Sequence, residues 1–207
     1  METRDEVTAE EAPPGWVLST PTRFREVWDL PLLALVLAGV TVVVGAAFGD
    51  LLALVTGVVT AVIVAAGAVA LFVTARRAYV EQTWGASWDL HRTRVVVGVT
   101  AGAVVMVGSL VVGILFATVI GTIGAVAQIK GFARSVPRFD HSAVASAFLA
   151  VTGACVVLVV LGLALPEQPV LPGWRAAVWV GGAGAFAVFA AVLALVSARR
   201  AAAAPLE

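Results

Sequence analysis

VVVGVTAGAVVMVGSLVVGILFATVIGTIGAVAQ, from Val95 to Gln128, is a run of 34 residues without a charge or a proline. A membrane-spanning helix needs about 20 apolar residues, so the run is long for one crossing and short for two. Whether it crosses once or twice decides the topology of the whole chain.

The composition places this stretch in a membrane protein. Hydrophobic residues make up 61% of the chain and charged residues 13%, and the mean hydropathy is +1.03. Soluble domains carry about twice that share of charge. Long apolar runs of this kind predict an all-α, polytopic bundle of membrane-spanning helices.

Two further apolar stretches flank the central run, and each divides into two spans. The first is broken at Gly49-Asp50, which predicts a turn between spans of about 30–48 and 51–74. The last, from Ala143 to Ser197, is broken by the polar, proline-rich connector PEQPVLPGWR.

The distribution of basic residues favours a hairpin for the central run, turning near Gly108-Ser109. A single tilted helix would divide the 13 basic residues eight to five between the two sides. A hairpin leaves only Arg175 on the far side, as the positive-inside bias favours. The residues on the near side are then Arg4, Arg23, Arg25, Arg76, Arg77, Arg92, Arg94, Lys130, Arg134, Arg138, Arg199 and Arg200.

The predicted architecture is therefore six transmembrane helices arranged as three hairpins, in a multi-pass protein of the cell membrane with both termini cytoplasmic. The hairpins cover about 30–77, 90–131 and 141–200, within one transmembrane domain at 22–200. The acidic, proline-containing segment 1–21 and the segment 201–207 are predicted to be disordered tails. Whether Leu206-Glu207 is native stays open.

An internal repeat supports three two-helix units. VWDLPLLALVL at Val27, SWDLHRTRVVV at Ser87 and RFDHSAVASAF at Arg138 each place an aromatic-Asp pair before an apolar run. We expect the acids to cap the helices that follow and the aromatic rings to lie among the lipid headgroups. These residues are Asp29, Asp89, Asp140, Trp28, Trp88 and Phe139.

Few residues inside the predicted spans point to chemistry. No ionisable residue lies within the six cores, and Asp50 is interpreted as a solvated turn residue rather than an ion contact. The small pair Gly98 and Gly102 is expected to pack helices within the chain rather than to form a dimer. In-span hydroxyls are expected to bond within the bundle rather than to line a substrate path; they are Thr41, Thr56, Thr60, Thr100, Ser109, Thr118, Thr122, Ser146 and Thr152.

The sequence predicts no catalytic residue, no bound metal and no cofactor. Cys155 is the one cysteine and is expected to be a buried small hydrophobe, while His91 and His141 flank apolar runs and form no ligand set. Hydrolase and phosphate-loop motifs are missing. The basic, aromatic connectors beside the spans are expected to meet the bilayer and its anionic headgroups rather than nucleic acid. A second copy of the chain or a membrane protein could be a partner.

The last hairpin carries a family resemblance. Its sequence, AVTGACVVLVVLGLALPEQPVLPGWRAAVWVGGAGAFAVFAAVLALVSARR from Ala150 to Arg200, has a glycine-bearing helix, a proline at the turn, a second glycine-bearing helix and a basic stop. This pattern resembles the HdeD-like acid-resistance membrane proteins, which are built from short repeats. The resemblance implies a six-helix membrane protein associated with stress tolerance, and it carries over no site residue.

Two functions from different classes follow from these observations. The leading expectation is a non-enzymatic structural or stress-related membrane protein, or an accessory subunit of a membrane complex. The alternative is a small transporter or channel, with a path lined by Thr56, Thr60, Thr118 and Thr122. An enzyme is the least favoured interpretation.

Overall fold

The computed structural model describes residues 20–113, 137–165 and 173–204. These residues are helical without a strand, and they hold five helices that are long and apolar enough to cross a membrane. The helices are α2 (Glu26–Ala47), α3 (Leu51–Glu81), α4 (Trp84–Val112), α6 (Pro137–Ala164) and a last crossing made of α7 (Gly173–Ala177), the π-helical turn η1 (Val178–Ala183) and α8 (Gly184–Ala203). The described part of the chain is thus all-α, and its helices suggest a membrane protein.

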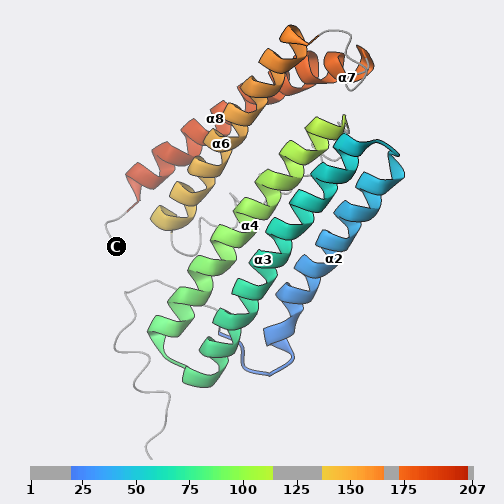
Figure 1. The fold of residues 1–207 in the computed structure, drawn as a ribbon. Coiled ribbons are helices and arrows are strands. Elements are labelled where there is room, and N and C mark those ends of the chain that lie inside the picture. Colours follow the sequence, from blue (N-terminus) through green and yellow to red (C-terminus); the bar gives the residue numbers. More distant parts are fainter. Residues whose placement is uncertain (1–19, 114–136, 166–172, 205–207) are drawn as a thin grey trace, which may run out of the picture.

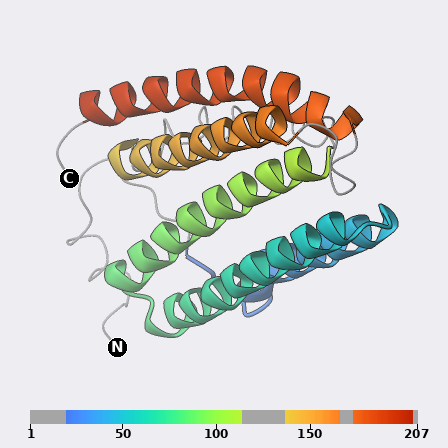
Figure 2. The same ribbon diagram turned by 45° about the horizontal axis from the view of Figure 1, so that its top comes forward.

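The helices lie side by side in the order α2, α3, α4, α6 and α8 (Figures 1 and 2). In each helix, only 17% to 28% of the most apolar 18-residue stretch is buried inside the chain. Large side chains on the outside, such as Leu33, Val43 and Val188, are about two-thirds exposed. Since a soluble protein would hide such residues, these faces fit contact with lipid.

The turn between α2 and α3 lies where the sequence predicts it. Gly49 has a left-handed φ of +71°, and Asp50 caps α3 by accepting a hydrogen bond from the Ala53 amide at 2.9 Å. Further along, a Cβ added to Gly57 would lie 2.5 Å from the Thr41 carbonyl oxygen, because the two backbones nearly touch there. The Thr41 hydroxyl also reaches the Gly57 carbonyl oxygen, at 3.3 Å.

α3 and α4 extend well beyond the predicted apolar cores. α3 continues past Thr74 to Glu81, and α4 begins at Trp84 with Thr83 as its cap, accepting from the Ala86 amide at 3.3 Å. The predicted capping role of Asp89 is therefore wrong: its carboxylate instead bonds Arg77 of α3, at 3.3 Å.

The predicted turn near Gly108-Ser109 is also wrong, because α4 runs through it to Val112 and stops at Gly113, whose φ is +96°. The Ser109 hydroxyl donates to the Val105 carbonyl oxygen of its own helix at 2.7 Å. Gly108 allows close packing against α3, since a Cβ there would lie 3.2 Å from the Thr60 hydroxyl. The small residues thus serve helix packing, and the second half of the predicted central hairpin lies outside the described residues.

α6 and α8 pack as an antiparallel pair over a core of small and apolar side chains. Cys155 is fully buried there, as predicted. α8 continues to Ala203, past the predicted boundary at Arg200. The core residues shared by the two helices and the turn before α8 include Val144, Phe148, Val151, Leu158, Trp179, Ala183, Ala187, Ala190 and Ala194.

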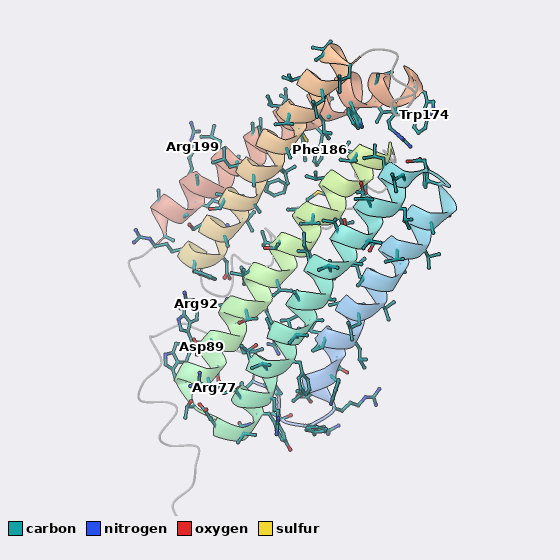
Figure 3. All side chains as sticks on the ribbon, in the orientation of Figure 1. Arg77, Asp89, Arg92, Trp174, Phe186 and Arg199 are labelled. Atoms are coloured by element: carbon teal, nitrogen blue, oxygen red, sulfur yellow. The ribbon has the colours of Figure 1, made fainter. Side chains whose placement is uncertain are left out.

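The two ends of the bundle differ in charge. We call the end that carries Arg77, Arg92, Arg138 and Arg200 the basic end, and the other the Asp50 end. Figure 3 shows Arg77, Asp89 and Arg92 at the basic end and Trp174 at the Asp50 end. α2 starts and α8 finishes at the basic end (Figure 1). This asymmetry among the described helices matches the predicted one-sided distribution of arginine.

Candidate functional site

At the Asp50 end, an ion pair joins the turn before α3 to α7, the start of the last crossing. Arg175 donates from Nη2 to Oδ2 of Asp50 at 2.7 Å, and the two side chains are 3% and 36% exposed. The guanidinium also lies over the ring of Trp174, 5.0 Å from its centroid. Its Nε has no hydrogen-bond partner among the residues described. The pair therefore holds a largely buried positive charge against the turn before α3.

This contact corrects the interpretation of Asp50 as a merely solvated turn residue. The Arg175 hydrogen bond first, and the Ala53 amide second, hold the pKa of Asp50 below its ordinary value. One signal in the sequence could have found the pair: Arg175 is the one basic residue predicted on the same side as Asp50.

Two tryptophans pack against the C-terminal end of α4, next to this ion pair. The Trp179 indole nitrogen donates to the carbonyl oxygen of Val111 at 3.2 Å, which supplies a partner for one of the last carbonyls of that helix. A Cβ on Gly113 would lie 2.5 Å from the Trp174 ring, so the ring packs directly on the backbone. Together with the ion pair, these contacts fix the last crossing against α3 and α4.

At the basic end, α4 and α6 are joined by His91 and Asp140, whose Nε2 and Oδ1 atoms are 2.9 Å apart. Asp140 is fully buried, and His91 is 16% exposed and stacks on Trp88 with 5.6 Å between ring centroids. Asp140 thus bonds across helices, and Trp88 and Phe139 contact each other at 5.7 Å rather than serving only as headgroup anchors. Because His91 and Asp140 are 49 positions apart in the sequence, no local pattern shows this pair.

Two more polar side chains are buried on α6 and α8. His141 is 3% exposed and Ser197 of α8 is fully buried. Within the part of the chain that the structure describes, His141 Nδ1 and Ser197 Oγ have no hydrogen-bond partner. No group of three or more metal-ligating side chains occurs among the described residues.

Between the two ends, a groove of about 410 Å³ runs along α3, α4 and α6. Thr56 and Thr60 are its hydroxyl-bearing residues, and Thr56 donates to the Leu52 carbonyl oxygen of its own helix at 2.7 Å. The remaining lining is valine, alanine and glycine. Thr118 and Thr122, which the alternative function would add to this path, lie outside the described residues.

Five of the in-span hydroxyls that the structure describes bond to the backbone of their own helix. Thr41, Thr56, Ser109, Ser146 and Thr152 each donate to a carbonyl oxygen three or four residues earlier, at 2.7 to 3.0 Å. A hydroxyl that is satisfied in this way offers little to a polar ligand.

The expected intrachain packing at Gly98 and Gly102 is not found in the described part of the chain, where no atom lies within 4 Å of a Cβ built at either position. Gly45 and Gly57 are instead the described glycines at which a Cβ would lie within 3 Å of another helix's backbone. A small-xxx-small spacing allows close approach, but it does not say which helix face meets a neighbour.

The chain matches no model of a known protein family, no curated protein sequence and no solved structure.

Proposed function

We propose that this chain is a non-enzymatic integral membrane protein, structural or stress-related, or an accessory subunit of a membrane complex. The observation that carries the proposal is where the polar groups lie. Described ion pairs occur at the two ends of the bundle, while the groove between them is lined by valine, alanine, glycine and two threonines. A path for ions or polar solutes would need polar groups at mid-depth.

We further propose six crossings of the cell membrane, with both termini and the basic end in the cytoplasm. The His91–Asp140 contact puts the starts of α4 and α6 at the same end, so these helices run in the same direction. α4 finishes at the Asp50 end, where Trp179 bonds Val111. These two contacts support a return crossing between Gly113 and Pro137.

A flux assay tests the leading function. The purified full-length chain is reconstituted into vesicles that contain a pH-sensitive dye, and leakage of protons, Na⁺ and K⁺ is compared with that of protein-free vesicles. The proposal predicts equal rates. A clear increase in flux for any of these ions contradicts it.

The accessory-subunit version has its own test, in native membranes. Blue native electrophoresis of gently solubilised membranes should find the chain in a complex larger than its own mass of 21.2 kDa plus detergent. A chain that migrates as a monomer, with unchanged abundance after loss of each neighbouring membrane protein, argues against a subunit.

The second candidate is a small transporter or channel, and the groove is the observation that favours it. Thr56 and Thr60, two of the four threonines proposed for such a path, line it. If flux is found, replacing Thr60 by Val should reduce it while leaving the fold intact. The same substitution at Thr74, whose hydroxyl bonds its own helix outside the groove, is the matched control.

A further inference from the structure

At the basic end, α4 and α6 are joined by two side chains that can each bind a proton, His91 and Asp140. α4 packs closely with α3, and α6 with α8, whereas α4 and α6 are joined less extensively and have the 410 Å³ groove beside them. The His91–Asp140 contact, at 2.9 Å, is therefore placed to control how the α3–α4 pair meets the α6–α8 pair.

We propose that His91 and Asp140 form a proton-binding site, and that a bound proton holds the starts of α4 and α6 together. An imidazole gains its charge within the range of about pH 5 to 8. A proton on His91 adds a positive charge to the donor, so that the hydrogen bond to the Asp140 carboxylate becomes an ion pair as well. Because Asp140 is fully buried, water screens this attraction little.

The surroundings hold the pair in place to bind the proton. Trp88 stacks on the His91 ring with only 11° between the planes, which fixes the direction of the Nε2 atom. Arg92 lies over the Phe139 ring, 5.6 Å from its centroid. On the exposed side Arg77 bonds both Asp89 and Glu81, so these two acids have a cation of their own.

Other charged groups lie on the helices that meet at the basic end. They are Arg77 and Glu81 on α3, Asp89, Arg92 and Arg94 on α4, Arg138 and His141 on α6, and Arg199 and Arg200 on α8. Most of them are cations, and Asp140 is the acid that the His91 imidazole contacts, at 2.9 Å.

His141 is the natural control for this site. It adjoins Asp140 in sequence and is buried, but its Nδ1 has no hydrogen-bond partner within the described residues. A proton added to Nδ1 would therefore lack an acceptor, and α4 would gain no contact. Proton-dependent behaviour should follow His91 and not His141.

The first experiment uses the full-length chain in nanodiscs with ¹⁵N-labelled histidine. The chain has 2 histidines, so the variants H91Q and H141Q assign both imidazole signals. We expect the His91 signal to titrate, and Asp140→Asn to move its midpoint to lower pH. A midpoint that Asp140→Asn leaves unchanged overturns the site.

The second experiment measures the consequence for the helices. Spin labels are placed at two exposed positions, Gly85→Cys on α4 and Ser146→Cys on α6, with the buried Cys155 replaced by Ala. We expect the distance distribution to broaden as the pH rises from about 5.5 to 8.5, across the histidine range. H91Q should abolish this change and H141Q should retain it. A distribution that does not change with pH, or that changes equally in H91Q, overturns the proposal.

Discussion

The ion pair between Asp50 and Arg175 makes the sharpest prediction about stability. Asp50→Asn removes the negative charge but keeps a side chain that caps α3 as well as Asp does. Arg175, which is 3% exposed, then keeps its charge without the carboxylate. Breaking a fully buried pair costs about 3–5 kcal/mol, and an exposed pair is worth about 0.2–1 kcal/mol. Since Asp50 is 36% exposed, we expect a cost between these limits, about 1–3 kcal/mol.

A double-mutant cycle isolates this energy. The free energy of unfolding is measured for the full-length chain in mixed micelles, with SDS as denaturant, for Asp50→Asn, Arg175→Gln and the double variant. We expect a coupling of about 1–2 kcal/mol, because contacting charges in a partly buried pair are not additive. Asp50→Ala should cost about 1 kcal/mol more than Asp50→Asn, since it also removes the cap.

The matched control is the exposed pair of Arg77 and Glu81 at the basic end. Its Nε and Oε1 atoms are 2.9 Å apart, but both side chains are at least 40% exposed. Glu81→Gln should therefore change the free energy of unfolding much less than Asp50→Asn does. A coupling between Asp50 and Arg175 within error of zero, or no larger than that of the control, would refute the reasoning.

Three further predictions concern the Asp50 end and the helix contacts. Because the pKa of Asp50 is lowered in the folded chain, its stabilising charge is present above its ordinary pKa and is lost as the pH falls below about 4; acid titration of the unfolding free energy should show this loss in the native chain and not in Asp50→Asn. Gly57→Ala should destabilise by about 1–3 kcal/mol, because its Cβ would lie 2.5 Å from a backbone oxygen of α2, whereas Gly39→Ala, with no atom within 4 Å, should be neutral or stabilise by up to about 1 kcal/mol; equal effects in SDS unfolding would contradict the close packing. Gly113→Ala should cost more than Gly49→Ala, because both have positive φ but only the former meets an indole ring, at 2.5 Å; the same assay compares them.

Local signals in the sequence predicted the parts of the fold that depend on neighbouring residues. Gly49-Asp50 marked a turn because one residue allows a left-handed backbone and the next caps a helix. The apolar runs predicted the helices because a bilayer demands about 20 such residues. Gly108-Ser109 misled because a serine that bonds its own helix is as compatible with a straight span as with a turn.

The contacts across the bundle could not be predicted in the same way. Asp50 and Arg175 are 125 residues apart, and His91 and Asp140 are 49 apart. Asp50 and Asp140 also had sufficient local explanations, as a turn residue and as a helix cap. Only the packing of helices from distant parts of the chain decides which polar side chain finds which partner.

The number of crossings is tested most directly by the side of the membrane on which a cysteine can be labelled. Single cysteines are placed at Phe48, Arg76 and Lys130 of the chain with Cys155 replaced by Ala, and a membrane-impermeant maleimide is applied to right-side-out and inverted vesicles. The account predicts that positions 76 and 130 are labelled from one side and position 48 from the other. Labelling of position 130 from the same side as position 48 would contradict a return crossing between α4 and α6.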